Sequence, residues 1–403
     1  TGARSVGSGT RVATAPTDLA MRTVAVSPPP PTWVVDAVRA GGVEPVVVGD
    51  PDDVDTVDAL VWTDPSGPAG LDRWLAAHPG IAWVQLPWAG VEPYAEAGIF
   101  DHDRVWTSGK DVYSDPVAEM ALTMALMGLR GLDRYARAAT WTGPVGRNLV
   151  DAEVCILGAG GITAALLGLL APFRATTTVV RRQDVPMAGA TRTVTLDHLD
   201  EVIGTADVVV LALALTPSTR GIIDRRRLES MADHAWLVNV ARGGHVVTDD
   251  LVDALAAGAI GGAGLDVTDP EPLPDGHPLW SFDNCIITPH VGNTPEMAVP
   301  LLSARVTDNV RRFLAGDGLV GVVDADLGDE FHVNARHRVR VFQIVDQLRQ
   351  VAGKLRRKRQ GVITTFRVKG NRKAGYAGRK THKAKWPWQA GQVNGAQGPD
   401  PRF

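Results

Sequence analysis

An arginine, a glutamate and a histidine each follow the end of an apolar run in the second half of the chain. They are Arg242 after the run at 236–240, Glu271 after the run at 262–267 and His290 after the run at 285–288. Short apolar runs of this kind are typical of buried parallel strands, whose carboxyl ends border the ligand crevice of an open sheet. We therefore expect the three side chains to meet at one site.

Together the three residues have the side chains that reduction of a carbonyl group by hydride requires. A histidine can give the proton to the carbonyl oxygen, because its unperturbed pKa is about 6.5. A neighbouring carboxylate can orient the ring and stabilise the imidazolium. An arginine can hold a substrate carboxylate through two hydrogen bonds and polarise the carbonyl. Each residue also has an ordinary explanation, as a solvated strand end or as part of a loop between prolines.

A glycine turn upstream indicates what this site would bind. The turn follows an apolar run, precedes an apolar segment at 164–173, and contains Gly158, Gly160 and Gly161. A strand, tight turn and helix in this order place backbone N–H groups where a pyrophosphate can lie. The motif is incomplete because Thr163 stands at its third glycine, and glycine turns between strands and helices are common.

The next expected strand, at 176–180, ends in Arg181 and Arg182. In dinucleotide-binding βαβ units this position contacts the adenosine ribose, where a carboxylate binds the 2′-hydroxyl and an arginine favours a 2′-phosphate. A guanidinium can pair with the phosphate dianion through two hydrogen bonds. The alternative is that both arginines only solvate the strand end. With the glycine turn upstream, we favour NADP over NAD.

Strands and helices alternate in two parts of the chain, which predicts an α/β protein with parallel sheets. In the first part we expect strands at 23–26, 46–48, 59–62 and 82–86, and helices at 33–39 and 71–77. In the second part we expect strands at 154–157, 176–180, 207–213, 236–240, 262–267 and 285–288. Between them, 106–112 is expected to be a connector. Asp115 as the N-cap and Pro116 in the first turn predict the start of a long helix, Val117 to about Ala139, whose apolar side could be a core face or a subunit contact.

A small-residue turn that includes Ala89 and Gly90 follows the fourth expected strand. Backbone N–H groups exposed there could bind an anion. An ordinary turn explains the same residues. Trp88 beside them is bulky, and the sequence does not determine which substrate would fit next to it.

The composition indicates a globular protein whose C-terminal tail differs from the rest of the chain in charge. The 403 residues suffice for two domains, and no run of 18 apolar residues predicts a membrane span. Residues 1–20 lack the apolar core of a secretory signal, and Met21 resembles a natural start, so we expect 1–20 to be a disordered preface. Cys155 and Cys285 lie in apolar runs and are expected to be buried free thiols, as in a reducing cytoplasm.

The net charge of −4 conceals a strong asymmetry. Residues 329–403 have 18 Lys/Arg and 4 Asp/Glu, whereas the rest of the chain has 23 and 41. Within this basic tail, the spacing of apolar residues over 341–355 is compatible with an amphipathic helix. Basic residues interleaved with tryptophans could bind nucleic acid. We instead expect 328–403 to be a disordered extension, or sequence that does not belong to the working protein, and we do not expect it to bind nucleic acid.

Several motifs together resemble the D-isomer-specific 2-hydroxyacid dehydrogenase family, over residues 21 to 327. They are the glycine turn 158–162, Leu-Thr-Pro-Ser-Thr-Arg-Gly at 215–221, Val-Asn-Val-Ala-Arg-Gly at 238–243, Gly-Leu-Asp-Val at 264–267 continuing to Glu-Pro-Leu at 271–273, and Thr-Pro-His-Val-Gly at 288–292. Asp-Pro-Val-Ala-Glu at 115–119 also fits the helix that enters the family's nucleotide domain. The combination is far more specific than any single motif.

The resemblance implies a Rossmann-type doubly wound parallel sheet inserted into a second, smaller flavodoxin-like α/β domain. The substrate domain would comprise 21–112 and 295–327, and the dinucleotide-binding domain 113–294. The chain would cross between them near residues 110 and 294, and these crossings would act as the hinge. The protein is expected to be a cytoplasmic homodimer.

By the same resemblance, Arg242 would hold a small 2-oxo acid, and His290 paired with Glu271 would be the acid/base. The expected cofactor-binding residues are Gly158, Gly160, Gly161, Ile162, Arg181, Arg182, Thr216, Val240, Ala241, Asp266, His290 and Gly292. Among these, the amides of Gly161 and Ile162 would meet the pyrophosphate, and Asp266 would accept from the nicotinamide carboxamide. Ala89 and Gly90 would bind the substrate carboxylate through backbone N–H groups. No metal is implied.

The sequence also departs from the family pattern. Thr163 at the third glycine is expected to loosen helix–strand packing slightly, and Arg181 replaces the acidic residue typical of NAD users. Glu271 is retained, which argues against the related formate-oxidising enzymes, since they use an amide there. A competing hypothesis is a non-catalytic NAD(P)-sensing protein, like corepressors of similar fold, with the basic tail on nucleic acid. The presence of Arg242, Glu271 and His290 weighs against it.

Overall fold

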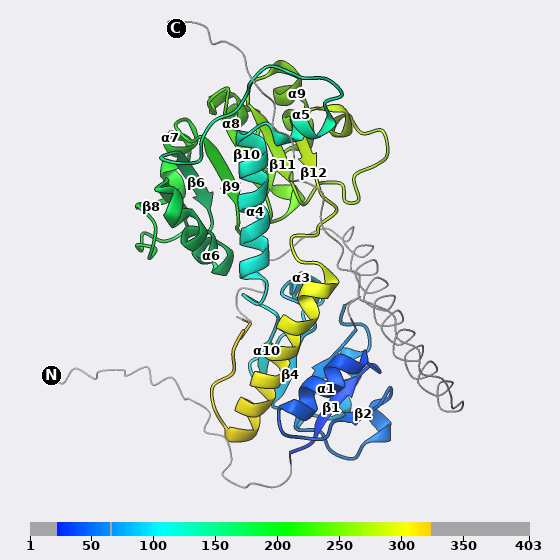
Figure 1. Cartoon of the computed structure of the whole chain (residues 1–403). Coiled ribbons are helices and arrows are strands. Elements are labelled where there is room, and N and C mark those ends of the chain that lie inside the picture. Colours follow the sequence, from blue (N-terminus) through cyan, green and yellow to red (C-terminus); the bar gives the residue numbers. More distant parts are fainter. Residues whose placement is uncertain (1–21, 65–66, 324–403) are drawn as a thin grey trace, which may run out of the picture. The chain divides into compact units, whose positions relative to one another are not determined.

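The computed structural model describes residues 22–64 and 67–323, which form two parallel sheets with their helices (Figure 1). The expected preface 1–20, the tail 328–403 and the helix at 341–355 lie outside the described residues. Within the described ranges, no helix combines the length and the apolar character needed to cross a membrane.

The first sheet has five strands in the order β2-β1-β3-β4-β5, all parallel. This is the flavodoxin-like order that the resemblance predicts. The strands are β1 (Val24–Ser27), β2 (Val46–Val47), β3 (Ala59–Trp62), β4 (Trp83–Gln85) and β5 (Val105–Thr107). The helices of this part are α1 (Thr32–Ala40), η1 (Pro51–Asp53), α2 (Leu71–Ala77), α3 (Glu92–Glu96) and α10 (Pro295–Ala315).

Alternate residues of these strands enter two different cores, because successive side chains of a strand point to opposite faces. On β1, Ala25 joins the core under α2, and Val24 and Val26 join the core under α1 and α10. The C-terminal helix α10 adds Val306 and Val310 to this second core. A helix from the far end of the described chain thus completes the first sheet's domain. The exact boundaries at 112 and 295 stay predictions.

The second sheet has seven parallel strands in the order β12-β11-β10-β9-β6-β7-β8. Numbered within this part, the order is 3-2-1-4-5-6-7 from one edge, the doubly wound Rossmann order with one strand added. The strands are β6 (Glu153–Leu157), β7 (Thr176–Arg181), β8 (Arg192–Thr195), β9 (Val208–Leu211), β10 (Trp236–Asn239), β11 (Gly262–Leu265) and β12 (Cys285–Ile287). The expected fold class is confirmed.

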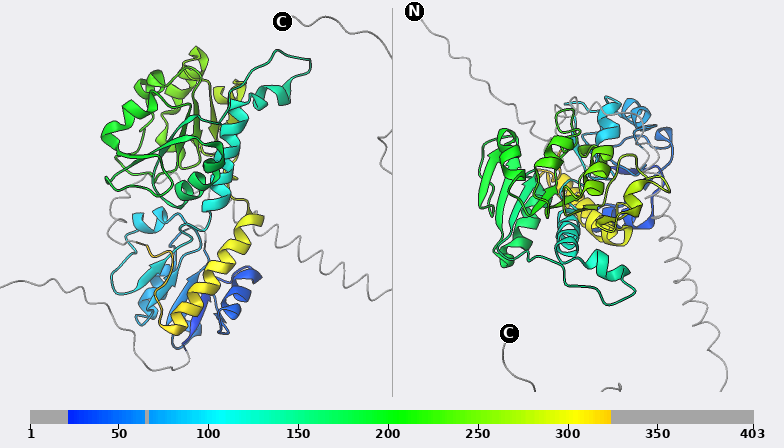
Figure 2. Two further views of the ribbon diagram at one scale, coloured as in Figure 1. Left: turned by 60° about the vertical axis from the view of Figure 1, so that its left-hand side comes forward. Right: turned by 90° about the horizontal axis from the view of Figure 1, so that it is seen from above.

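Helices cover both faces of the second sheet (Figure 1, Figure 2). One face carries α4 (Ser114–Leu129) and α6 (Gly161–Leu170), and the other carries α7 (Leu199–Ile203), α8 (Arg225–Ser230) and α9 (Thr248–Ala257). The strands are therefore buried on both sides and read as continuous apolar runs, as Val208–Leu211 does. Cys155 and Cys285 are buried free thiols, as expected, and burial raises the pKa of each to about 12.

Three local predictions were wrong. The expected long helix is two helices, α4 and α5 (Leu132–Arg137), because Gly131 has φ +61° and interrupts the helical backbone. Helix α4 begins at Ser114 with Tyr113 at the N-cap, so that Asp115 lies in the first turn and is not the cap. The connector expected at 106–112 overlaps β5, and β8 was not expected because its sequence, Arg-Thr-Val-Thr, is polar.

Candidate active site

The glycine turn after β6 needs glycine for conformation and for space. Gly158 has φ +112°, and a Cβ placed on it would lie 2.7 Å from the carbonyl carbon of Ala212. At Gly160, the residue before α6, an added Cβ would meet nothing within 4 Å. The turn is thus tight against the neighbouring strand end and open at the start of α6. A glycine cradle that opens at a helix N-terminus fits a pyrophosphate.

Thr163, at the position of the missing third glycine, is completely buried. Its hydroxyl donates to the carbonyl oxygen of Gly158 at 3.0 Å. The side chain therefore joins α6 to the turn that precedes it, where we had expected looser packing. A satisfied hydroxyl of this kind avoids the cost of burying a polar group without a partner.

Arg181 and Arg182 lie where β7 ends, beside the glycine turn in the sheet order. Arg181 is partly buried, and its Nη1 donates to the carbonyl oxygen of Val185 at 3.1 Å. Arg182 is exposed. The sequence-based position of both side chains at this strand end is confirmed, whereas contact with a 2′-phosphate stays a prediction.

Arg242 follows β10, and two buried side chains hold its carbonyl oxygen. Asn239 Nδ2 donates to this oxygen at 2.9 Å, and His245 Nδ1 lies 2.9 Å from it. Both side chains have no solvent exposure, and burial lowers the pKa of His245. Sequence reasoning missed them. A histidine directly before the apolar pair at 246–247 was the signal that could have identified the second one.

The Arg242 turn packs directly against the segment that leads to Glu271. A Cβ on Gly243 would overlap the Thr268 carbonyl and lie 2.6 Å from the nitrogen of Asp269. The Thr268 amide donates to Glu271 Oε2 at 3.4 Å. The absence of a side chain at Gly243 therefore allows the arginine loop and the glutamate loop to approach this closely.

His290 and Glu271 form the pair that the sequence predicts. His290 Nδ1 lies 3.5 Å from Glu271 Oε1, and the side chains are 32% and 15% exposed. His290 has φ +53°, an unusual backbone conformation for a residue other than glycine. Such conformations often occur at functional sites, where the surrounding structure imposes them.

The surroundings of His290 favour a neutral ring. Burial is the main cause that lowers its pKa, and the positive charge of Arg242 lowers it further, while Asp266 acts in the opposite direction. Arg242 and His290 are therefore close enough to interact electrostatically. The three strand ends involved, those of β10, β11 and β12, are neighbours in the sheet.

Asp266 holds the loop that presents His290. Its Oδ1 accepts hydrogen bonds from the Thr288 hydroxyl at 2.6 Å and the Val291 amide at 2.8 Å, and its Oδ2 accepts from the Gly292 amide at 2.9 Å. The carboxylate is almost completely buried. Positioning of this loop is a role that the sequence did not suggest, and a contact with a carboxamide stays a prediction.

The remaining expected cofactor residues lie at the same sheet edge. Thr216 follows β9, where its amide donates to Thr219 Oγ1 at 2.8 Å. Val240 and Ala241 are buried directly after β10. By strand order, the glycine turn and Arg181 form one group at β6 and β7, and Arg242, Glu271 and His290 form a second group at β10 to β12, with the Thr216 loop between them.

Ala89 and Gly90 follow β4 of the first sheet and are partly buried. Gly109 donates its amide to the Trp88 carbonyl at 2.8 Å, so the loop is fixed to the start of the first crossing. Among the described residues, the amides of Ala89 and Gly90 have no hydrogen-bond acceptor. They are available to bind an anion.

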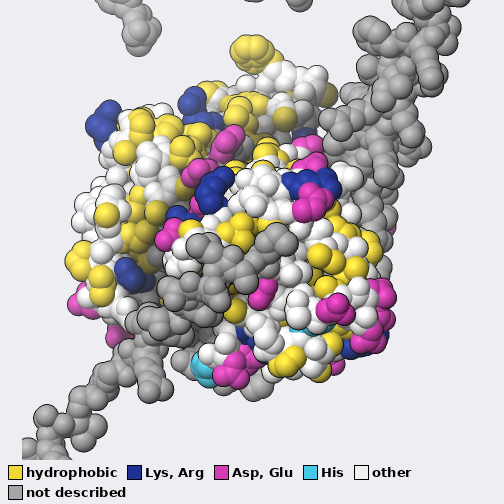
Figure 3. Space-filling model, turned by 90° about the horizontal axis from the view of Figure 1, so that it is seen from below, with side chains coloured by type: hydrophobic (Ala, Val, Ile, Leu, Met, Phe, Trp, Pro, Cys, Tyr) yellow, Lys and Arg dark blue, Asp and Glu magenta, His cyan; other side chains and the backbone are white. Residues whose placement is uncertain are grey.

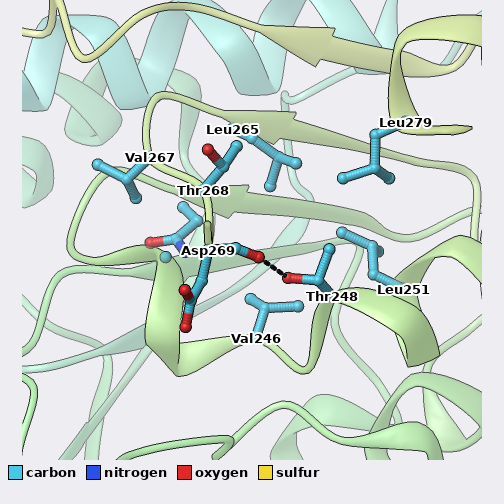
Figure 4. A pocket seen from close by; sticks show the side chains of 10 residues that line it. Val246, Thr248, Leu251, Leu265, Val267, Thr268, Asp269 and Leu279 are labelled. Atoms are coloured by element: carbon cyan, nitrogen blue, oxygen red, sulfur yellow. Dashed lines mark hydrogen bonds between the residues drawn. The ribbon is translucent and has the colours of Figure 1, made fainter. Parts of the chain in front are cut away.

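A small pocket lies behind the Arg242 turn (Figure 4). Its lining is mostly apolar and comes from the ends of β10 and β11 and from the start of α9. Thr248 Oγ1 donates to the Asp269 carbonyl at 2.6 Å and closes one side. Arg242, Glu271 and His290 are not among the residues that line it.

Charged side chains are mixed on the face of the molecule in Figure 3. Lysine and arginine side chains of the described residues form no continuous patch on that face, since acidic and apolar side chains lie between them.

Comparison with known proteins gives a consistent result. Residues 120–292 match the family model "D-isomer specific 2-hydroxyacid dehydrogenase, NAD binding domain". Glyoxylate/hydroxypyruvate reductase A of Photorhabdus laumondii is 32% identical over 285 residues, 67% of this chain and 87% of that protein.

Solved structures are similar over most of the chain. An NADPH-dependent glyoxylate/hydroxypyruvate reductase from Sinorhizobium meliloti, solved with NADP and sulfate, has a TM-score of 0.63 at 26% identity, over 76% of this chain and 99% of that one. A D-isomer specific 2-hydroxyacid dehydrogenase from Lactobacillus delbrueckii, solved with NAD, has a TM-score of 0.62 at 23% identity, over 75% and 100%. The second resemblance concerns the fold alone.

Proposed function

The chain belongs to the D-isomer-specific 2-hydroxyacid dehydrogenase family, and we propose that it reduces a small 2-oxo acid such as glyoxylate or hydroxypyruvate, with NADPH preferred. The observation that carries this proposal is the grouping of Arg242, Glu271 and His290 at three neighbouring strand ends. The oxidoreductase class and the use of NAD(P) follow from the family. The finer claims, on substrate, residue roles and cofactor preference, are the proposal.

The proposed roles follow from the positions of the side chains. When bound, reduced nicotinamide supplies the hydride that the carbonyl carbon accepts. His290 holds the proton for the carbonyl oxygen, and Glu271 at Nδ1 orients the ring so that Nε2 makes the transfer. Arg242 pairs with the substrate carboxylate and lowers the cost of negative charge on the carbonyl oxygen.

The chain's own residues fit a dinucleotide. The open turn at Gly158, Gly160 and Gly161, with Ile162 in the first turn of α6, would hold the pyrophosphate through amide groups. Arg181 and Arg182 at the end of β7 support the preference for a 2′-phosphate. The Sinorhizobium structure with NADP is consistent with this preference.

The substrate carboxylate would also contact the first sheet's domain. Ala89 and Gly90 present amides that have no acceptor among the described residues. Two such donors and the Arg242 guanidinium together would select a 2-oxo acid over a neutral ketone, because leaving buried donors unpaired is costly.

The test is a set of 2-oxo acids assayed with NADPH and with NADH, on the wild type and on His290→Asn. Asparagine tolerates positive φ, so this change removes the proton donor without straining the loop. We expect turnover to fall about 100-fold or more, while NADPH binding remains measurable. The control is His198→Asn on the exposed turn before α7. Full turnover by His290→Asn would refute the assigned role, and absence of turnover by the wild type on every acid would refute the function.

A further inference from the structure

The first crossing between the two sheets places a hydroxyl and a carboxylate against the glycine turn. A Cβ on Gly161 would overlap the hydroxyl oxygen of Ser114 and lie 2.6 Å from Asp111 Oδ1. A Cβ on Gly160, one residue earlier, would have no atom within 4 Å. The turn thus has one open side and one side walled by Ser114 and Asp111. Neither residue belongs to the expected cofactor-binding set.

The Ser114 hydroxyl does not contribute to the hydrogen bonding of the described fold. Its oxygen is buried and has no hydrogen-bond partner among the described residues. It does not cap α4, since Tyr113 is the N-cap and makes no side-chain cap bond. A buried hydroxyl without a partner costs free energy. The position beside Gly161 supplies a partner once a phosphate oxygen lies over the turn.

Asp111 brings negative charge to the place where a phosphate would lie. Its side chain is exposed, its φ is +64°, and its charge is felt by Arg305 of α10. Arg305 donates to the carbonyls of Ser108 and Lys110, both at 3.0 Å, and so lies along the same crossing. A pyrophosphate over the turn would be repelled by Asp111 and attracted by Arg305.

We propose that Ser114 is a further ligand of the cofactor's pyrophosphate and that Asp111 weakens pyrophosphate binding through charge repulsion. This inference rests on the proposed function, because it assumes that the glycine turn binds a dinucleotide. Ser114 donates its hydroxyl hydrogen to a phosphate oxygen. Asp111 lowers the affinity for the pyrophosphate, because its carboxylate repels the phosphate charge.

The test measures NADPH binding by calorimetry in the absence of substrate. Ser114→Ala should weaken binding roughly tenfold or more, as loss of a hydrogen bond to a charged group does. Asp111→Asn keeps the size and tolerates positive φ, and it should tighten binding about fivefold at low salt and less at high salt. The control is Asp115→Asn, which removes the same charge from an exposed position in the first turn of α4.

Two further measurements separate a ligand from a structural residue. Thermal unfolding of Ser114→Ala without cofactor should not occur at a lower temperature, since the change removes an unpaired buried hydroxyl. Binding of adenosine 2′-phosphate, which lacks the pyrophosphate, should be unchanged in both variants. If the wild type binds NADPH and both variants match it, or if Ser114→Ala unfolds at a lower temperature and loses both ligands, the inference is wrong. A wild type that binds no nicotinamide nucleotide would instead overturn the proposed function.

Discussion

At the residue scale, Glu271 and His290 form a close pair of a carboxylate and an imidazole ring. The ring and the carboxylate are 3.5 Å apart, and burial together with Arg242 lowers the pKa of His290. In the free enzyme the ring is therefore neutral at neutral pH. Reduction of a 2-oxo acid needs the protonated ring, so kcat/KM for reduction should fall as pH rises, whereas kcat/KM for oxidation should rise to a plateau.

Glu271→Gln should displace both pH profiles to lower pH. The carboxylate stabilises the imidazolium, so its removal lowers the pKa of His290 further and leaves less protonated enzyme at any given pH. Reduction measured at fixed pH should drop about tenfold for each unit by which the pKa falls. The measurement is kcat/KM for both directions across the acid range. Glu229→Gln, on the exposed side of α8, is the matched control, and an unmoved profile in Glu271→Gln would contradict the coupling.

The positions of Arg242 and His290 could be predicted from the sequence because each depends on a local pattern, whereas the contacts that support their loops could not. Arg242 and His290 each stand at the end of an apolar run, which fixes their place at a sheet edge. The contact of Gly243 with the Thr268–Asp269 peptide joins loops 25 residues apart and has no local signal. The same holds for Asp266, whose identity suggested a ligand contact although its oxygens hold the His290 loop.

At the scale of elements, the strands could be predicted because burial makes their sequences apolar. Helix ends were harder to predict because they depend on the backbone conformation of single turn residues. Strand β3 and helix α2 have the expected bounds, because an apolar run and an amphipathic repeat are unambiguous there. The break between α4 and α5 depends on one left-handed glycine, Gly131, inside an otherwise helical sequence. Strand β8 is a polar edge strand, and its pairing with β7 supplies the stability that its sequence does not indicate.

We expect the β6-α6-β7 unit to determine the cofactor preference. Arg181→Asp should lower NADPH affinity and favour NADH, because a carboxylate repels the 2′-phosphate and can accept from a 2′-hydroxyl. The ratio of the two affinities should change about 10- to 100-fold, as expected from loss of a charge-assisted hydrogen bond. Binding of both nucleotides to both proteins gives the ratio. Arg311→Asp, on the exposed side of α10, makes the same charge change elsewhere. An unchanged ratio would mean that Arg181 only solvates the strand end.

At the scale of the whole molecule, the segment 132–145, which follows α4, is our candidate for the interface of the expected homodimer. Trp141 is fully exposed, and Leu132 and Val145 are about half exposed. The segment is nevertheless ordered by contacts, since the Val145 amide donates to the Tyr135 hydroxyl at 2.7 Å and that hydroxyl donates to the Gly143 carbonyl at 3.1 Å. Exposed apolar side chains on a segment fixed in this way are typical of a surface that another chain covers.

We therefore expect a homodimer that buries Trp141. Trp141→Ser should weaken dimerisation about tenfold or more, because tryptophans at the centre of interfaces often contribute most of the binding energy. Light scattering across a dilution series measures the dimer dissociation constant, and thermal unfolding checks that the monomer still folds. Trp280→Ser removes a tryptophan that is about half exposed outside this segment and should leave the constant unchanged. A wild type that is monomeric at every concentration would refute the dimer, and equal constants for Trp141→Ser and wild type would place the interface elsewhere.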